Sequence, residues 1–135
     1  MAERDPRQRL LERAIEVGAR AYAPYSHFRV GAAVEDADGA VYVGCNVESA
    51  SYGLTICAER SAIFAAVAAG ASRPYAALAV TCLDAESGGC SPCGACRQVL
   101  VEHLRSDAPV FVDGLGQFTA AELLPHSFAL KEGQP

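Results

Sequence analysis

The sequence has no cluster of lysine or arginine residues, and its overall charge is acidic. Asp and Glu number 16 against 11 Lys and Arg, which gives a formal net charge of −5 spread along the chain. Nucleic-acid binding through counterion release needs a basic patch that neutralises phosphates. A Gly-rich loop of the kind that cradles phosphates is missing as well. The sequence therefore predicts no nucleic-acid partner.

Long hydrophobic runs are also missing. The longest uncharged apolar stretch, residues 61–72, is too short to span a bilayer. The N-terminus is charged from its first residues and lacks the apolar core of a secretory signal. We therefore expect no membrane association and a cytoplasmic location. Six cysteines could form disulfides only in an oxidising compartment, so metal binding or buried thiols are the better interpretation.

Internal repeats, linkers and low-complexity segments are absent too. At 135 residues the chain is large enough to bury a core but too short for two independently folded halves. We therefore expect a single domain over residues 1–135, with one site.

Helical and strand patterns alternate along this domain. Asp5 and Pro6 fit an N-cap and a first helical residue, and apolar residues then recur at helical spacing up to Pro24. The remaining expected elements are strands at 29–35, 40–46, 75–82 and 109–113, and helices at 57–69, at 93–106 and after a capping box at 119–122. This order, α-β-β-α-β-α-β-α, predicts a mixed sheet with helices on its faces.

Two short segments carry residues suited to metal chemistry. Cys57 stands at the start of one predicted helix, and Cys93 and Cys96 stand at the start of another. The partial positive charge at a helix N-terminus favours thiolates. Three thiolates can fill three of the four tetrahedral positions of Zn²⁺ and leave the fourth to water, whose pKa falls from about 15.7 to about 7. The pattern predicts one catalytic zinc ion per chain.

Charged residues follow the first of these cysteines. Glu59 lies two residues beyond Cys57, close to the open metal position, where a carboxylate can take a proton from water and pass it to a substrate. Three thiolates leave the zinc site with a net negative charge, which the adjacent Arg60 can offset. The combination matches the zinc deaminase signature for cytosine-type substrates, with Cys57 where some members have His.

The same cysteines allow other interpretations. Cys93 and Cys96 alone could form a redox pair, or the trio could be a closed structural site. Cys90 extends the run to Cys-x-x-Cys-x-x-Cys, which could ligate an iron–sulfur cluster or supply a fourth zinc ligand that blocks the water. Cys45 and Cys82 lie in strand patterns and are expected to be small buried residues. Three histidines lack a partner at metal-binding spacing and are expected to be surface or structural residues: His27, His103 and His126.

Blocks along nearly the whole chain resemble the small homotetrameric cytidine deaminases. They occur in the family's order and are YAPYS (22–26), FRVGAA (28–33), GCNVE (44–48), CAER (57–60), SPCGACRQ (91–98) and ELLP (122–125) through Phe128. The resemblance implies a three-layer α/β/α fold with a mixed five-stranded sheet. It also implies hydrolytic deamination of cytidine and 2′-deoxycytidine to uridine and 2′-deoxyuridine with release of ammonia, as in pyrimidine salvage, without an organic cofactor.

The resemblance also assigns substrate contacts. It implies that Asn46 and Glu48 hydrogen-bond the sugar 3′-hydroxyl, that Phe28 packs beside the nucleoside, and that the Ala58 backbone N–H holds the pyrimidine O2. Asn46 and Glu48 are two residues apart on an extended segment, so both side chains can face one hydroxyl. In this family the residue corresponding to Arg60 donates hydrogen bonds to the thiolates. The resemblance also implies a homotetramer in which three residues contribute to a neighbouring subunit's site: Ala50, Tyr52 and Phe128.

Two other functions are compatible with these motifs. The first is deamination of a modified cytosine nucleoside antibiotic, since related enzymes share the zinc motifs. The second is a non-catalytic zinc- or nucleoside-binding module that keeps the fold. A substrate panel tests the first, and binding without turnover would indicate the second.

Overall fold

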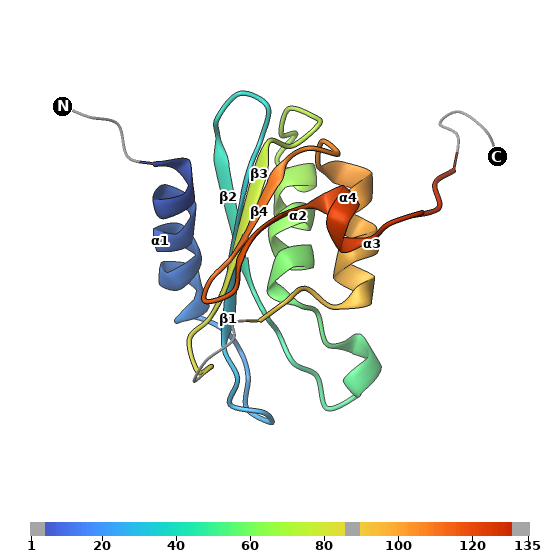
Figure 1. Cartoon of the computed structure of the whole chain (residues 1–135). Coiled ribbons are helices and arrows are strands. Elements are labelled where there is room, and N and C mark those ends of the chain that lie inside the picture. The colour runs from blue at the N-terminus through green and yellow to red at the C-terminus, as the bar shows by residue number, and fades with distance from the viewer. Residues whose placement is uncertain (1–4, 86–89, 131–135) are drawn as a thin grey trace.

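The structure, a computed structural model, describes residues 5–85 and 90–130, so the first four residues of the charged N-terminus lie outside the described part (Figure 1). Each helix and strand predicted from sequence patterns is present, with one strand more. In chain order the elements are α1 (Pro6–Gly18), β1 (Val30–Glu35), β2 (Val41–Cys45), η1 (Tyr52–Leu54), α2 (Ala58–Ala68), β3 (Ala77–Cys82), α3 (Gly94–His103), β4 (Pro109–Val112), β5 (Gly116–Thr119) and α4 (Ala120–Leu123).

The strands form one mixed five-stranded sheet in the order β2-β1-β3-β4-β5. β1 pairs antiparallel with β2 and with β3, β3 pairs parallel with β4, and β4 pairs antiparallel with β5. The β1–β2 pair is the hairpin predicted from the turn at 36–39. Gly39 in that turn has a φ of 92°, a conformation that glycine adopts without strain.

Helices cover both faces of the sheet and give the molecule three layers (Figure 1). On one face α1 packs Leu10 and Ala14 against Ala33, Ala79 and Phe111. On the other face α2 and α3 cover the larger apolar cluster. Strand side chains alternate between the two clusters, as the period of two requires. The cluster under α2 and α3 includes Val34, Ala62, Ile63, Leu78, Val80, Leu100 and Val110. The predicted three-layer α/β/α fold is confirmed.

Helix α1 is shorter than the sequence pattern predicts. It ends at Gly18 rather than just before Pro24. The Tyr22 N–H donates to the Asn46 carbonyl at 3.0 Å, and Tyr22 forms a parallel bridge with Val47. This long-range pairing satisfies backbone groups that a longer helix would have satisfied internally. The helical spacing of apolar residues beyond Gly18 was therefore misleading.

Strand β5 carries no strand signal in the sequence. Its residues, Gly-Gln-Phe-Thr, are mostly half-buried, and the strand lies at the edge of the sheet beside β4. Its last residue begins the predicted capping box: the Thr119 hydroxyl accepts from the Glu122 N–H, and the Glu122 carboxylate accepts from the Thr119 N–H. The short last helix is confirmed.

The α2–α3 layer positions the candidate site. A Cβ built on Gly44 of β2 would lie 2.3 Å from the Ala62 backbone nitrogen, so α2 rests directly on the strand backbone. Helices α2 and α3 begin at the same end of this layer (Figure 1). None of the helices described here has the length and apolar character needed to cross a bilayer.

Candidate active site

Cys57, Cys93 and Cys96 meet where α2 and α3 begin. Cys57 is the N-cap of α2, Cys93 is the N-cap of α3, and Cys96 lies in the first turn of α3. Their sulfur atoms all lie within 4.8 Å of one another, and those of Cys57 and Cys93 are 3.9 Å apart. Two sulfur ligands of a tetrahedral zinc ion, each about 2.3 Å from the metal, lie about 3.8 Å apart. The cluster therefore has the spacing of a zinc site.

Hydrogen bonds favour the thiolate form of Cys57. Arg60 Nη2 donates to Cys57 Sγ at 3.3 Å, and the Cys96 N–H approaches Cys93 Sγ at 3.5 Å. Hydrogen bonding from the Cys96 thiol, together with Arg60, lowers the pKa of Cys57 to about 5. The adjoining Cys57 sulfur and burial raise the pKa of Cys96. Negative charge is therefore favoured on Cys57, beside the Arg60 guanidinium.

Glu59 lies beside the cysteines and is almost fully buried, with 5% of its surface exposed. Burial raises the pKa of Glu59 to about 7, and the nearby Cys57 charge acts in the same direction. A carboxyl group whose pKa lies near neutrality can both accept and donate a proton. Glu59 is therefore a buried residue of the site and not an exposed surface residue of α2.

A pocket of about 390 Å³ opens onto Cys57, Cys93 and Glu59. Its volume falls within the range of small-molecule sites. Predicted substrate residues from three separate segments meet in it. The other lining residues are Ser26, Phe28, Val30, Asn46, Glu48, Thr55, Ala58, Cys90 and Ser91.

Asn46 ties one wall of this pocket together. Its Oδ1 accepts from the Val30 N–H at 2.8 Å, and its Nδ2 donates to the Phe28 carbonyl at 2.9 Å. The residue is 8% exposed. An amide nitrogen carries two hydrogens, so one N–H remains for a ligand. Asn46 thus fixes the backbone on either side of residue 29 and keeps one donor.

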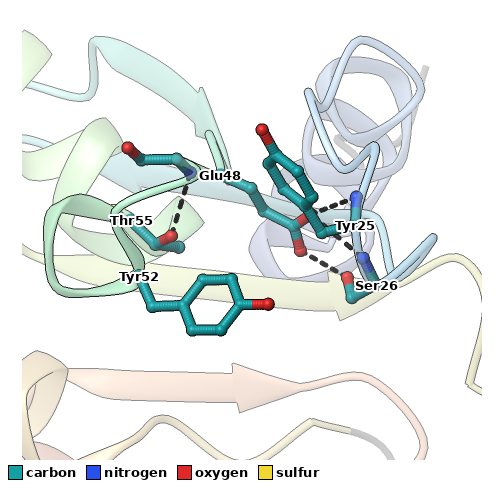
Figure 2. A pocket seen from close by; sticks show the side chains of 6 residues that line it. Tyr25, Ser26, Glu48, Tyr52 and Thr55 are labelled. Atoms are coloured by element: carbon teal, nitrogen blue, oxygen red, sulfur yellow. Dashed lines mark hydrogen bonds between the residues drawn. The ribbon is translucent and has the colours of Figure 1, made fainter.

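Glu48 is held by the turn that precedes Phe28. The N–H groups of Tyr25 and Ser26 donate to its Oε1 at 3.0 and 3.1 Å, and the Ser26 hydroxyl donates to Oε2 (Figure 2). These bonds lower the pKa of Glu48, with the Ser26 hydroxyl as the largest cause. A carboxylate has about four acceptor positions, so one is left for a ligand hydroxyl. Asn46 and Glu48 thus line the same pocket but are held by different backbone groups, Asn46 by those of Phe28 and Val30 and Glu48 by those of Tyr25 and Ser26.

The remaining predicted substrate residues stay outside this pocket within the chain. Ala50 is exposed, and Phe128 is 66% exposed on the C-terminal segment. Tyr52, 79% exposed, lines an adjoining hollow of about 400 Å³ together with Tyr25, Ser26 and Glu48 (Figure 2). Within a single chain, Ala50, Tyr52 and Phe128 therefore do not line the pocket at the cysteines.

Comparison with known proteins decides the family. A sequence model of the cytidine and deoxycytidylate deaminase zinc-binding region matches residues 4–112. The cytidine deaminase of Sporosarcina psychrophila is 43% identical over 129 residues, which is 93% of both chains. That of Halalkalibacterium halodurans is 45% identical over 130 residues, covering 93% of this chain and 96% of the relative. The chain belongs to the cytidine and deoxycytidylate deaminase family.

Solved structures of the family agree with this fold. Cytidine deaminase from Burkholderia pseudomallei superposes with a TM-score of 0.83 at 45% identity, covering 92% of this chain and all of the other. The enzyme from Mycobacterium tuberculosis gives a TM-score of 0.83 at 40% identity, covering 94% and 100%. The family's matched region is zinc-binding, and three thiols at zinc spacing fit that metal. Zinc is the cofactor.

Cys82 was expected to be buried and is half-buried at the end of β3. It lies beside Cys90, with Cα atoms 5.9 Å apart. The sheet brings the end of β3 next to the segment that enters α3, a proximity that strand and helix patterns do not reveal. Cys45 is half-buried and free. The metal cluster among the described residues contains neither Cys90 nor a histidine, so the fourth-ligand alternative gains no support from this family member.

Several residues near the site were not predicted from the sequence. The Ser26 hydroxyl donates to the Glu48 carboxylate. Thr55 lines the pocket, and its hydroxyl accepts from the Ser49 N–H at 3.1 Å. Ser91 lines the pocket next to Cys93. Ser26 and Ser91 lie inside the matching family blocks, which is the one signal that could have singled them out. Arg29, between two pocket residues, pairs with Asp84 at 2.9 Å and was likewise missed.

Proposed function

We propose that this family member catalyses hydrolytic deamination of cytidine and 2′-deoxycytidine to the uracil nucleosides and ammonia, as a step of pyrimidine salvage. The observation that carries the proposal is the juxtaposition of buried Glu59 with three thiols in one open pocket. Its relatives in Sporosarcina psychrophila and Halalkalibacterium halodurans are cytidine deaminases. A purely structural zinc site needs neither a buried carboxyl group nor a pocket in front of it.

Cys57, Cys93 and Cys96 would hold zinc, and Arg60 would offset the charge of their thiolates. When bound, zinc supplies a Lewis acid that makes hydroxide available at neutral pH. Glu59 accepts one proton from the attacking water and delivers it to N3 of the cytosine ring as the oxygen bonds to C4. It then accepts the second proton from that oxygen and delivers it to the amine, so that the C4–N bond breaks and ammonia leaves. Its raised pKa suits both directions of transfer, because each proton step then costs little free energy near pH 7.

The pocket supplies complementary contacts for the rest of the nucleoside. The first N–H groups of a helix have no intrahelical partner, so that of Ala58, the first residue of α2, can donate to the pyrimidine O2. The remaining donor on Asn46 and the remaining acceptor position on Glu48 suit a sugar hydroxyl, which is both acceptor and donor. Phe28, 40% exposed, offers an aromatic face beside the flat base.

The homotetramer is part of the same proposal. Exposed apolar side chains on η1, α2 and the C-terminal segment would be covered by neighbouring subunits, and they include Tyr52, Leu54, Phe64, Val67 and Phe128. Ala50, Tyr52 and Phe128 would then close the open side of a neighbour's pocket. Closed symmetric assembly is a common way to bury such surfaces. We also keep the single domain over residues 1–135 and the cytoplasmic location as predictions.

The deciding experiment follows the absorbance of cytidine incubated with purified protein, with parallel measurement of ammonia. We expect conversion to uridine that stops after chelation and returns with added zinc. A panel with 2′-deoxycytidine and cytosine nucleoside antibiotics ranks the substrates by kcat/KM. Tight cytidine binding without ammonia release would identify a non-catalytic module, and preference for an antibiotic would identify the other rival.

A further inference from the structure

Arg97 links two parts of the molecule that are remote in sequence. It lies just after Cys96 on α3 and is half-buried. Its Nε donates to the Pro92 carbonyl at 2.8 Å, its Nη2 to the Ser91 hydroxyl at 2.7 Å, and its Nη1 to the Leu123 carbonyl at 2.8 Å. Two acceptors therefore belong to the segment that delivers Cys93, and the third belongs to the end of α4.

We propose that Arg97 is a positioning residue that fixes the zinc-ligand segment 91–93 and the C-terminal segment in one arrangement. The C-terminal segment leaves α4 directly after Leu123 and carries Phe128. The neighbouring Gln98 adds a second tie, because its Nε2 donates to the Phe128 carbonyl at 3.3 Å. Arg97 thus holds the start of the C-terminal segment at Leu123, and Gln98 holds the backbone of Phe128.

The chemistry of the contacts explains why an arginine stands here. The three acceptors are two carbonyls and one hydroxyl, so the side chain is used for its geometry rather than to neutralise a carboxylate. A guanidinium presents donors in fixed directions from one plane, whereas a lysine ammonium is a single point on a flexible stem. A lysine could reach one of the three acceptors well but could not bridge all three.

The consequence is a coupling between metal and C-terminal segment. Bound zinc would hold Cys93 in place, and with it the neighbouring Ser91 and Pro92. Arg97, which bonds both of these residues and Leu123, would then hold the start of the C-terminal segment in place as well. The role assigned to Phe128 in a neighbour's pocket rests on the proposed function, but the coupling itself does not. Groups that orient metal ligands typically change metal affinity by about 10- to 100-fold when removed.

The chain contains no tryptophan, so Phe128→Trp gives a fluorescence signal that comes from the C-terminal segment alone. In this background we expect removal of zinc to increase quenching of the tryptophan by acrylamide, while far-UV circular dichroism stays unchanged. Adding Arg97→Lys should abolish the zinc dependence of the quenching and accelerate zinc release to a chromogenic chelator by about 10-fold or more. Arg105→Lys is the matched control, since exposed Arg105 contacts Asp107 outside the site.

Ser91→Ala provides a second, milder variant that removes a single acceptor of Arg97. We expect it to accelerate zinc release and to loosen the C-terminal segment together, each by less than Arg97→Lys does. A zinc-dependent quenching signal that persists in folded Arg97→Lys would overturn the proposal, as would faster zinc release in Ser91→Ala with an unchanged C-terminal segment. If the wild-type chain did not turn over cytidine, the proposed function would be refuted. The zinc-release and quenching measurements would still test the role of Arg97.

Discussion

Gly44 of β2 and Ala62 of α2 touch through their backbones: a Cβ added at Gly44 would lie 2.3 Å from the Ala62 nitrogen and 2.8 Å from the Ser61 Cβ. The obstructing atoms include helix backbone, which cannot rotate away as a long side chain could. The strand and the helix that carries Cys57 and Glu59 at its start are therefore held at a distance that glycine alone permits.

Gly44→Ala should consequently destabilise the fold. Overpacking a well-packed interior typically costs 1–3 kcal/mol, and we expect at least about 2 kcal/mol because backbone must shift. Urea unfolding monitored by circular dichroism measures this loss. Gly53→Ala is the matched control, since a Cβ there meets nothing within 4 Å, and it should change the free energy of unfolding by less than about 1 kcal/mol. Equal stability of the two variants would contradict the packing argument.

Glu59→Gln should abolish most turnover while zinc remains bound. Glutamine keeps the shape of the side chain but cannot relay protons, so kcat for cytidine should fall by about 10²–10⁴ or more. Elemental analysis of the same preparation should still give one zinc per chain. Near-normal kcat would mean that another group moves the protons.

Cys90→Ser should retain zinc, whereas Cys93→Ser should lose it. Cys90 lies beside Cys82 and is not part of the three-sulfur cluster, while the Cys93 sulfur lies 3.9 Å from that of Cys57. Zinc per chain, measured after dialysis against a weak chelator, distinguishes the two variants. Equal loss from both would make Cys90 a ligand and would point to a closed site.

His103 should make the fold less stable as the pH falls. Burial lowers the pKa of His103 below 6.5, and nearby Arg73, whose Nη1 lies 2.7 Å from His103 Nδ1, acts in the same direction against a weaker opposite effect of Glu102. Below about pH 6.5 the unfolded chain therefore binds the proton first, and the free energy of unfolding decreases until the native histidine also titrates.

Urea unfolding of the wild type and His103→Gln between pH 7.5 and 5.5 measures this effect. The variant should lose less stability over that interval than the wild type. His126→Asn is the control, because it leaves His103 in place and asparagine tolerates the left-handed φ of 55° at that position. Parallel pH curves for the wild type and His103→Gln would show that His103 is not responsible.

The shared site can be tested by mixing two defective chains. One chain carries Glu59→Ala with Phe128 intact, and the other carries Phe128→Ala with Glu59 intact. After joint unfolding and reassembly, some pockets would combine Glu59 from one chain with Phe128 from its neighbour. Activity should then exceed the sum of the separate homo-oligomers. If mixed oligomers form without that gain, Phe128 acts within its own chain or has no role in the site.

Local sequence determined the parts of this protein that depend on a few neighbouring residues. The side chains of Asp5, Cys93 and Thr119 each accept a hydrogen bond from a helix N–H group nearby in sequence, so the starts of these helices were predictable. Because two ligand-bearing segments begin helices, their cysteines could be expected at helix ends. Three cysteines and Glu59 at family spacing were enough to indicate the chemistry.

Tertiary structure alone decided what depends on contacts between distant segments. α1 ends at Gly18 because Tyr22 pairs beside Val47, and β5 exists because β4 offers an open edge, although its own residues carry little hydrophobic signal. The Cys82–Cys90 pair, the burial of Glu59 and the bridge from Arg97 to Leu123 likewise join residues that no local pattern relates. Hydrogen-bond satisfaction and burial are properties of the packed molecule, so sequence spacing specified which groups do chemistry, while packing set their pKa values and positions.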